Sequence, residues 1–162
     1  MPKDLFSGHA REYAAFRPSY PDELIQFIIK HASKFDRTWD CGAGSGQVAR
    51  KLAPFFGQVD ATDISAHQLD QAPRIKNITY QLSKAEESPF LTDTFDLICV
   101  GHAVHWFDVE KFFLECSRVG GKNAVVALFG YSLVRLNSAF NEVLDRFYYD
   151  FIYPYWKRTK NS

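Results

Sequence analysis

The stretch Asp40-Cys41-Gly42-Ala43-Gly44-Ser45-Gly46 decides the fold of this chain. It follows the short apolar run 37–41 and precedes a helical pattern over 47–55, so it predicts a strand, a glycine turn and a helix in that order. Three glycines at alternate positions let the backbone turn sharply and leave room for a ligand against the chain. Taken alone, the triplet would equally fit a plain connection between a strand and a helix.

Strand and helix patterns alternate on both sides of this turn. The predicted strands cover 37–41, 59–63, 79–82, 95–101 and 123–129. The predicted helices cover 24–32, 47–55, 65–72 and 109–117, and Asp22 is the expected N-cap of the first. The run 97–100 is apolar throughout, which is typical of a strand buried on both faces. We therefore expect an α/β fold with a mostly parallel twisted sheet and helices on both faces, and ligands beyond the carboxyl ends of its strands.

Two acids near the glycine turn separate the possible ligands. Asp63 ends the second predicted strand about 20 residues after the turn, where a carboxylate can accept hydrogen bonds from both hydroxyls of a ribose; a helix cap or turn acid is the alternative. Asp40 lies two positions before the first glycine. It would repel the pyrophosphate of a dinucleotide but attract an ammonium group. The spacing is also GxGxG rather than the dinucleotide pattern GxGxxG, so a nucleoside with a positively charged arm fits better.

Composition excludes several classes of function. The 162 residues suit one domain with a real core. The 19 basic and 19 acidic residues balance, so we expect no nucleic-acid or membrane partner. Cys41, Cys99 and Cys116 lack disulfide or zinc spacing, so no metal is predicted and cytoplasmic residence is expected. We find no apolar leader and no run of about 18 apolar residues that would indicate a membrane span.

The motifs resemble one known family. The stretch 40–46 resembles motif I of class I S-adenosylmethionine (SAM) dependent methyltransferases (methyltransferase type 11 domain), and Asp63 occupies the place of the acid that holds the ribose there. The segments 85–90 and 93–97 are similar to the family's stretch that places adenine, although Lys84 stands where an acid is frequent. The resemblance implies a Rossmann-like class I fold and SAM as cofactor, with S-adenosylhomocysteine (SAH) as product. The implied cofactor-binding residues are Arg17, Asp40, Gly42, Ala43, Gly44, Gly46, Asp63, Ile64, Ala85, Glu86 and His102.

The resemblance extends over residues 6 to about 156. The opening with Arg17, Pro18, Tyr20 and Pro21 is similar to that of the branch containing trans-aconitate methyltransferase-like proteins, and 102–107 matches the "A-x-HWF" segment of that branch. Arg17 precedes the rigid Pro18, so its guanidinium is expected to pair with the methionine carboxylate of SAM; a surface arginine that caps a helix is the alternative.

Residues after the fourth predicted strand are candidates for contacts with the acceptor. His102 is expected near the methionine part of SAM, and His105 is the candidate general base if the acceptor must lose a proton. Tyr20 and Trp106 are the candidate substrate contacts. A buried anchor for the following helix is the alternative for Trp106.

The end of the chain departs from the family pattern. Class I methyltransferases have seven strands, and only five are predicted here. Residues 137–162 contain an aromatic stretch with helical spacing that resembles the family's substrate-covering segment. We therefore expect a SAM-binding domain over 1–136, the start of a covering segment over 137–162, and a chain that ends before the fold is complete.

Three functions are candidates for this sequence. The first is a SAM-dependent methyltransferase acting on a small molecule, in particular a carboxylic acid, which is already ionised at neutral pH and needs no base. The second is a SAM-binding module without catalysis that acts through protein partners of its aromatic tail. The third is a nicotinamide oxidoreductase, which the GxGxG spacing and Asp40 disfavour.

Overall fold

The computed structural model describes residues 19–132 and 134–154. These residues belong to two compact units that divide after Gly130. The domain boundary predicted from the sequence, after residue 136, lies inside the second unit.

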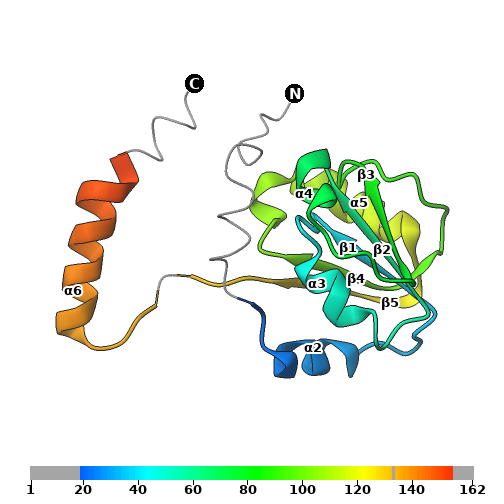
Figure 1. Ribbon diagram of the computed structural model, residues 1–162, viewed down its shortest axis with the longest axis horizontal. Helices are drawn as coiled ribbons and strands as arrows, with labels where there is room; N and C mark the ends of the chain where they lie inside the picture. The colour runs from blue at the N-terminus through cyan, green and yellow to red at the C-terminus, as the bar shows by residue number, and fades with distance from the viewer. Residues whose placement is uncertain (1–18, 133, 155–162) are drawn as a thin grey trace. The chain divides into compact units, whose positions relative to one another are not determined.

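A five-stranded parallel sheet forms the centre of the first unit (Figure 1). The strands are β1 (Arg37–Cys41), β2 (Gln58–Asp63), β3 (Ile78–Leu82), β4 (Phe95–Gly101) and β5 (Gly120–Phe129). They lie in the order β3-β2-β1-β4-β5, and every neighbouring pair is parallel. The predicted parallel sheet is therefore confirmed. Only the start of the last strand differs clearly, at Gly120 instead of 123.

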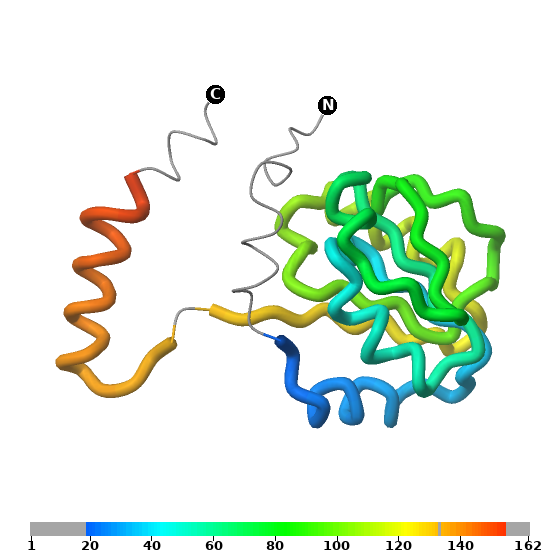
Figure 2. The backbone as a smooth tube through the Cα atoms, in the orientation of Figure 1, coloured from blue at the N-terminus to red at the C-terminus, as the bar shows by residue number. Residues whose placement is uncertain are grey.

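Helices cover both faces of this sheet, as the sequence predicts (Figures 1 and 2). They are α2 (Asp22–Ile29), α3 (Gln47–Leu52), α4 (Ala66–Asp70), the short 3-10 turn η1 (Val104–Trp106) and α5 (Val109–Val119). Apolar side chains of α2 and α3 pack in one cluster with Val59 and Leu97. Those of α5 pack in a second cluster with Trp39 and Ile98. The sheet thus separates two cores, because successive side chains of a strand point to opposite faces.

Helix ends differ from prediction in detail. Asp22 is the first residue of α2 and not its N-cap; Pro21 holds the cap position without a side-chain hydrogen bond. The acid still suits this place, because a carboxylate in the first turn interacts favourably with the helix dipole. The helix predicted to reach 55 ends at Leu52, followed by a turn. Ser65 caps α4, where its hydroxyl accepts from the Gln68 amide at 3.4 Å.

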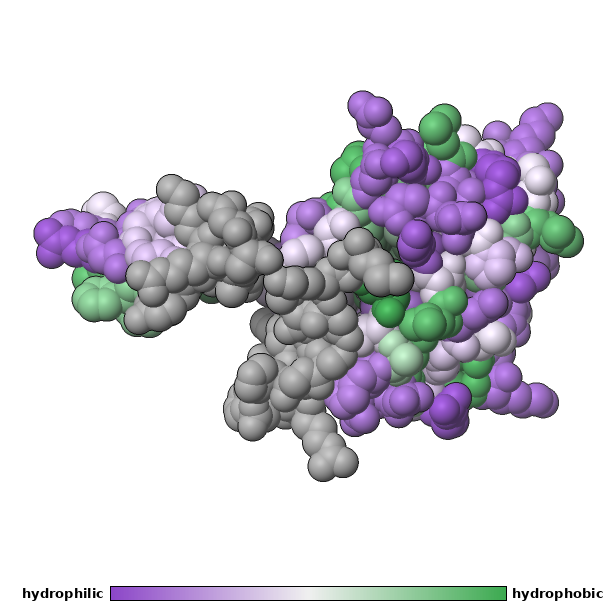
Figure 3. All heavy atoms as spheres, turned by 90° about the horizontal axis from the view of Figure 1, so that it is seen from above, coloured by the Kyte–Doolittle hydropathy of each residue, from purple (hydrophilic) through white to green (hydrophobic). Residues whose placement is uncertain are grey.

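The second unit contains the predicted aromatic helix. α6 (Ser138–Arg146) continues into the π-helical turn η2 (Phe147–Ile152). Asn137 caps α6, because its side-chain oxygen accepts from the Phe140 amide at 3.0 Å. The described part of this unit presents both hydrophilic and hydrophobic residues (Figure 3). Across the described residues of both units, no helix combines the length and apolarity needed to span a bilayer.

Candidate functional site

The carboxyl ends of the strands meet at one edge of the sheet. Cys41 at the end of β1 pairs with Thr62, and Asp63 at the end of β2 pairs with Leu82 at the end of β3. The chain passes from β1 to β2 on one side, whereas β4 lies on the other side of β1. Ligands of open parallel sheets bind at such a reversal of strand order. The glycine turn 42–46 leaves β1 at this point.

The glycine turn is held by its own backbone and by β2. Gly42, Gly44 and Gly46 have φ angles of 71°, 54° and 76°, in the left-handed region that glycine adopts without a steric cost. The amides of Gly42 and Ala43 donate to the Thr62 carbonyl at 2.8 and 2.9 Å. Ala43 is buried. The turn therefore has a defined shape whose left-handed φ angles favour glycine at all three positions.

Side chains from elsewhere in the chain pack directly on this turn. A Cβ atom at Gly42 would lie 2.6 Å from the Ala103 Cβ and 3.2 Å from the Phe107 ring. One at Gly46 would lie 2.5 Å from the Tyr80 hydroxyl. Burial and the nearby Asp40 charge raise the pKa of Tyr80 to about 12, so the hydroxyl stays protonated at neutral pH. Sequence reasoning missed Ala103, Phe107 and Tyr80 as neighbours of the turn, because no local pattern connects them with it.

Asp63 lies against the glycine turn, close to the residues with which the sequence groups it. The Gly44 amide donates to its Oδ2 at 2.8 Å and the Ser65 amide donates to its Oδ1 at 2.9 Å. These contacts orient the carboxylate, whose oxygens are hydrogen-bond acceptors of the kind that a ribose hydroxyl requires. The two predicted roles of Asp63, a turn acid and a ligand-binding acid, therefore do not exclude each other.

Asp40 lies beneath the turn and is fully buried. Its Oδ2 accepts from the Ala49 amide in the first turn of α3 at 2.8 Å. The carboxylate thus fixes the start of the helix that follows the glycines. From this depth its negative charge would act on a ligand through the turn, by attraction of a positive group rather than by surface contact.

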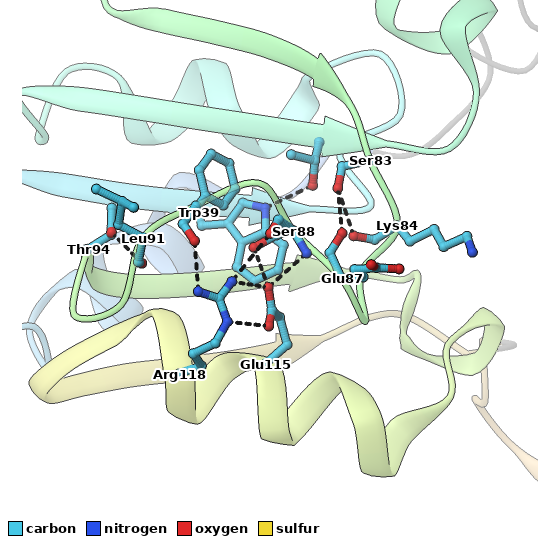
Figure 4. A network of polar contacts seen from close by, with 11 residues as sticks. Trp39, Ser83, Lys84, Glu87, Ser88, Leu91, Thr94, Glu115 and Arg118 are labelled. Carbon is cyan, nitrogen blue, oxygen red and sulfur yellow. Dashed lines mark hydrogen bonds and ion pairs between the residues drawn. The ribbon is translucent and has the colours of Figure 1, made fainter.

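The segment 83–90 borders the site beyond β3. The Ser83 amide donates to the Asp63 carbonyl at 3.0 Å, and Ala85 is buried in the core that contains Trp39. The Glu86 carboxylate accepts from the Asp108 amide at 2.8 Å, where α5 begins. Glu86 therefore has a structural contact of its own. The Lys84 side chain is exposed and points away from the neighbouring polar network (Figure 4). Ile64, next to Asp63, is 47% exposed.

The histidines follow β4 at the same edge. His102 has a φ of 55°, and its amide donates to the Phe129 carbonyl at 2.7 Å. Its ring centroid lies 5.3 Å from that of His105, and the rings of His105 and Trp106 are 5.0 Å apart. His105 and Trp106 are exposed on the η1 turn. The structure thus brings these three predicted residues together.

Tyr20 and Arg17 are the two remaining predicted residues. Tyr20 is buried beside Gly101 and makes an edge-on contact with Phe129 at 4.9 Å, so packing in the core accounts for its position. Its contact with substrate stays a prediction. Arg17 lies outside the described residues.

Comparisons with known proteins agree with one another. The family described as "Methyltransferase domain" matches residues 39–128. A putative methyltransferase of Dictyostelium discoideum is 35% identical over 157 residues, which cover 94% of this chain and 60% of the relative. An uncharacterized methyltransferase of Mycobacterium tuberculosis is 31% identical over 125 residues, covering 75% of this chain and 51% of the relative. The solved structure of a putative type II methyltransferase from Anaeromyxobacter dehalogenans matches with a TM-score of 0.74 and 37% identity, over 82% of this chain and 57% of that one. The chain therefore spans between half and two thirds of the length of these proteins.

Proposed function

The chain belongs to the methyltransferase domain family, so its cofactor is SAM, and we propose that the protein transfers the SAM methyl group to a small-molecule acceptor. The observation that carries this proposal is the 2.8 Å contact between the Gly44 amide and the Asp63 carboxylate. It joins the glycine turn and the acid into one site, which a nucleoside with a charged arm requires.

The residues of the site fit SAM. The turn formed by Gly42, Gly44 and Gly46 lets a ligand approach the backbone. Two carboxylates, Asp40 and Asp63, surround this turn, which suits a ligand with an ammonium group and no phosphate. A pyrophosphate would be repelled there, so the same acids argue against a nicotinamide dinucleotide.

We propose that each part of SAM has its own contacts in the site. Asp63 accepts hydrogen bonds from the ribose, and the exposed Ile64 beside it offers an apolar surface to the adenine. Backbone groups around Ala85 and Glu86 recognise the edge of the base, because the Glu86 carboxylate already bonds the Asp108 amide. Asp40, Ala43 and the glycines hold the methionine arm. His102 borders that arm, and Arg17 pairs with its carboxylate.

The chemistry needs alignment more than a reactive side chain. SAM supplies a methyl group already activated by its sulfonium. The protein must orient the acceptor and exclude water, and these effects can provide most of the rate enhancement. Trp106 and Tyr20 are the proposed acceptor contacts. His105 accepts a proton only when the acceptor must lose one.

We propose a carboxylic acid as acceptor, because a carboxylate is ionised at neutral pH and needs no base. The segment 137–162 is proposed to begin a cover over the acceptor. A cytoplasmic location belongs to the same proposal and is supported by three unpaired cysteines.

Calorimetry with SAH tests the cofactor site. Asp63→Asn keeps the size of the side chain but removes its charge, and we expect SAH affinity to fall about 100-fold, since hydrogen bonds to a charged group contribute about 1.5–3 kcal/mol each. Asp70→Asn is the matched control, because Asp70 is exposed at the end of α4. It should bind SAH as the wild type does.

Transfer of a labelled methyl group from SAM to a panel of small carboxylic acids tests the reaction. A wild-type protein that does not bind SAH would overturn the assignment of the site. Binding of SAH without transfer to any acceptor in the panel would favour the non-catalytic binding module instead.

A further inference from the structure

A buried acid on α5 lies outside the site described above. Glu115 is 7% exposed, and its Oε1 accepts from both the amide and the hydroxyl of Ser88, at 2.7 and 2.5 Å. Ser88 belongs to the segment 83–90 and lies 27 residues before Glu115 in the chain. The carboxylate is ionised, because the Arg118 guanidinium beside it lowers the pKa of Glu115 to about 2. The charged Glu115 carboxylate therefore holds the segment 83–90 in place.

Arg118 completes the arrangement from one turn further along α5 (Figure 4). Its Nε donates to Oε2 of Glu115 at 2.8 Å and its Nη2 donates to Oε1 at 2.6 Å. The same guanidinium donates to the carbonyls of Phe90 and Ser88 at 2.8 and 3.3 Å. Planar guanidinium groups suit such two-point pairing with a carboxylate. The pair thus binds the backbone of the segment at Ser88 and Phe90.

The other end of the segment is fixed at the candidate site. The Ser83 amide donates to the carbonyl of Asp63 at 3.0 Å, and Asp63 is the proposed ribose ligand. Residues 84–87 therefore connect one anchor at the end of β2 with a second anchor on α5. Within them the Ser83 hydroxyl donates to the carbonyls of Lys84 and Glu87, and the Glu86 carboxylate accepts from the Asp108 amide. Their backbone carries the proposed contacts to adenine, so the α5 anchor helps to set where those contacts lie.

We propose that the Glu115–Arg118 pair is a positioning device for adenine recognition, although neither side chain contacts the cofactor. This inference rests on the proposed function. Loss of the pair should let residues 84–90 shift, which weakens the contacts to the base more than those to the ribose and the methionine arm.

The preference of the protein for one of two ligands distinguishes positioning of the adenine contacts from a general stabilisation of the fold. S-inosylhomocysteine differs from SAH at the base edge, where it presents an N–H donor and a carbonyl acceptor in place of the acceptor nitrogen and amino donor of adenine. A site that hydrogen-bonds one pattern rejects the other. We expect the wild type to prefer SAH clearly. We expect Glu115→Gln to lose about tenfold in SAH affinity and most of this preference.

Two further variants make the experiment decisive. Glu110→Gln is the matched control, because it makes the same change at an exposed position of the same helix, and its affinities should equal those of the wild type. Ser88→Ala removes the hydroxyl donor but keeps the amide donor to Glu115. It should lower the SAH preference in the same direction by a smaller factor, about threefold, and it serves if Glu115→Gln fails to fold.

Hydrogen exchange of the amides of 84–90 provides a readout without ligand, and we expect faster exchange in Glu115→Gln while the amides of β1 and β4 stay protected. Unchanged preference for SAH in variants that are folded would overturn the positioning role and leave the proposed function intact. Absence of SAH binding by the wild type would reject the proposed function and this inference together.

Discussion

The two segments that border the candidate site are fixed by different means. The glycine turn 42–46 is shaped by its own φ angles and by amides that bond to β2 and Asp63. The segment 83–90 depends on side chains of α5, a helix that comes later in the chain. The first arrangement allows almost no substitution, whereas the second can be loosened step by step. The candidate site thus combines a rigid wall, the glycine turn 42–46, with an adjustable wall, the segment 83–90.

The largest effect is expected in the turn itself. Gly42→Ala would place a Cβ 2.6 Å from the Ala103 Cβ at a φ of 71°, so we expect a loss of about 3 kcal/mol in unfolding free energy, from backbone strain and overpacking together. Urea denaturation measures it. Gly121→Ala is the control, since its added Cβ would meet nothing closer than 3.5 Å among its nearest atoms, and it should change stability by less than about 1 kcal/mol. Equal stability of the two variants would show that the turn is not rigid.

A smaller effect is expected from acid at the adjustable wall. The pKa of Glu115 is lowered from 4.5 to about 2 by Arg118, so its contribution is complete above about pH 4.5 and is lost as the pH falls towards 2. Across this window the wild type should lose about 1–2 kcal/mol more unfolding free energy than Glu115→Gln, because solvent screens the ion pair at the 39% exposed Arg118 side chain. Denaturant unfolding at several pH values measures the difference. Parallel pH profiles of the two proteins would contradict the ionic nature of the anchor.

The smallest effect is expected just beyond the anchored residues. Leu91 is 81% exposed, and it follows Phe90, whose carbonyl Arg118 holds. Leu91→Ser should therefore change the unfolding free energy by less than about 0.5 kcal/mol and leave SAH affinity unaltered. Thermal unfolding and calorimetry are the measurements. A clear loss of affinity would mean that the adjustable wall extends past Phe90.

Most of the fold could be predicted from the sequence, because the strands and helices have clear local patterns and the order of elements restricts the sheet. The meeting of Asp63 with the glycine turn could be predicted as well, since parallel strands end at one edge. The depth of Asp40 could not, because the spacing shows only that an acid precedes the turn and not which face of the strand it occupies.

The anchor on α5 could not be predicted either. Glu115 and Arg118 are spaced i, i+3 on a helix, a pattern that is typical of an exposed surface pair. Their partners are backbone groups of Ser88 and Phe90 and the small hydroxyl of Ser88. No sequence pattern indicates that these groups bind a distant ion pair. Long-range contacts of this kind appear only when the packing of α5 against the sheet is known.

The buried thiols have a practical consequence. Cys41, Cys99 and Cys116 lie in β1, β4 and α5, and burial raises the pKa of each, that of Cys116 to about 12. Only thiolates react rapidly with alkylating reagents. Modification of these cysteines therefore requires the sheet to separate from its covering helices. The rate of alkylation under native conditions thus reports how often the protein opens spontaneously.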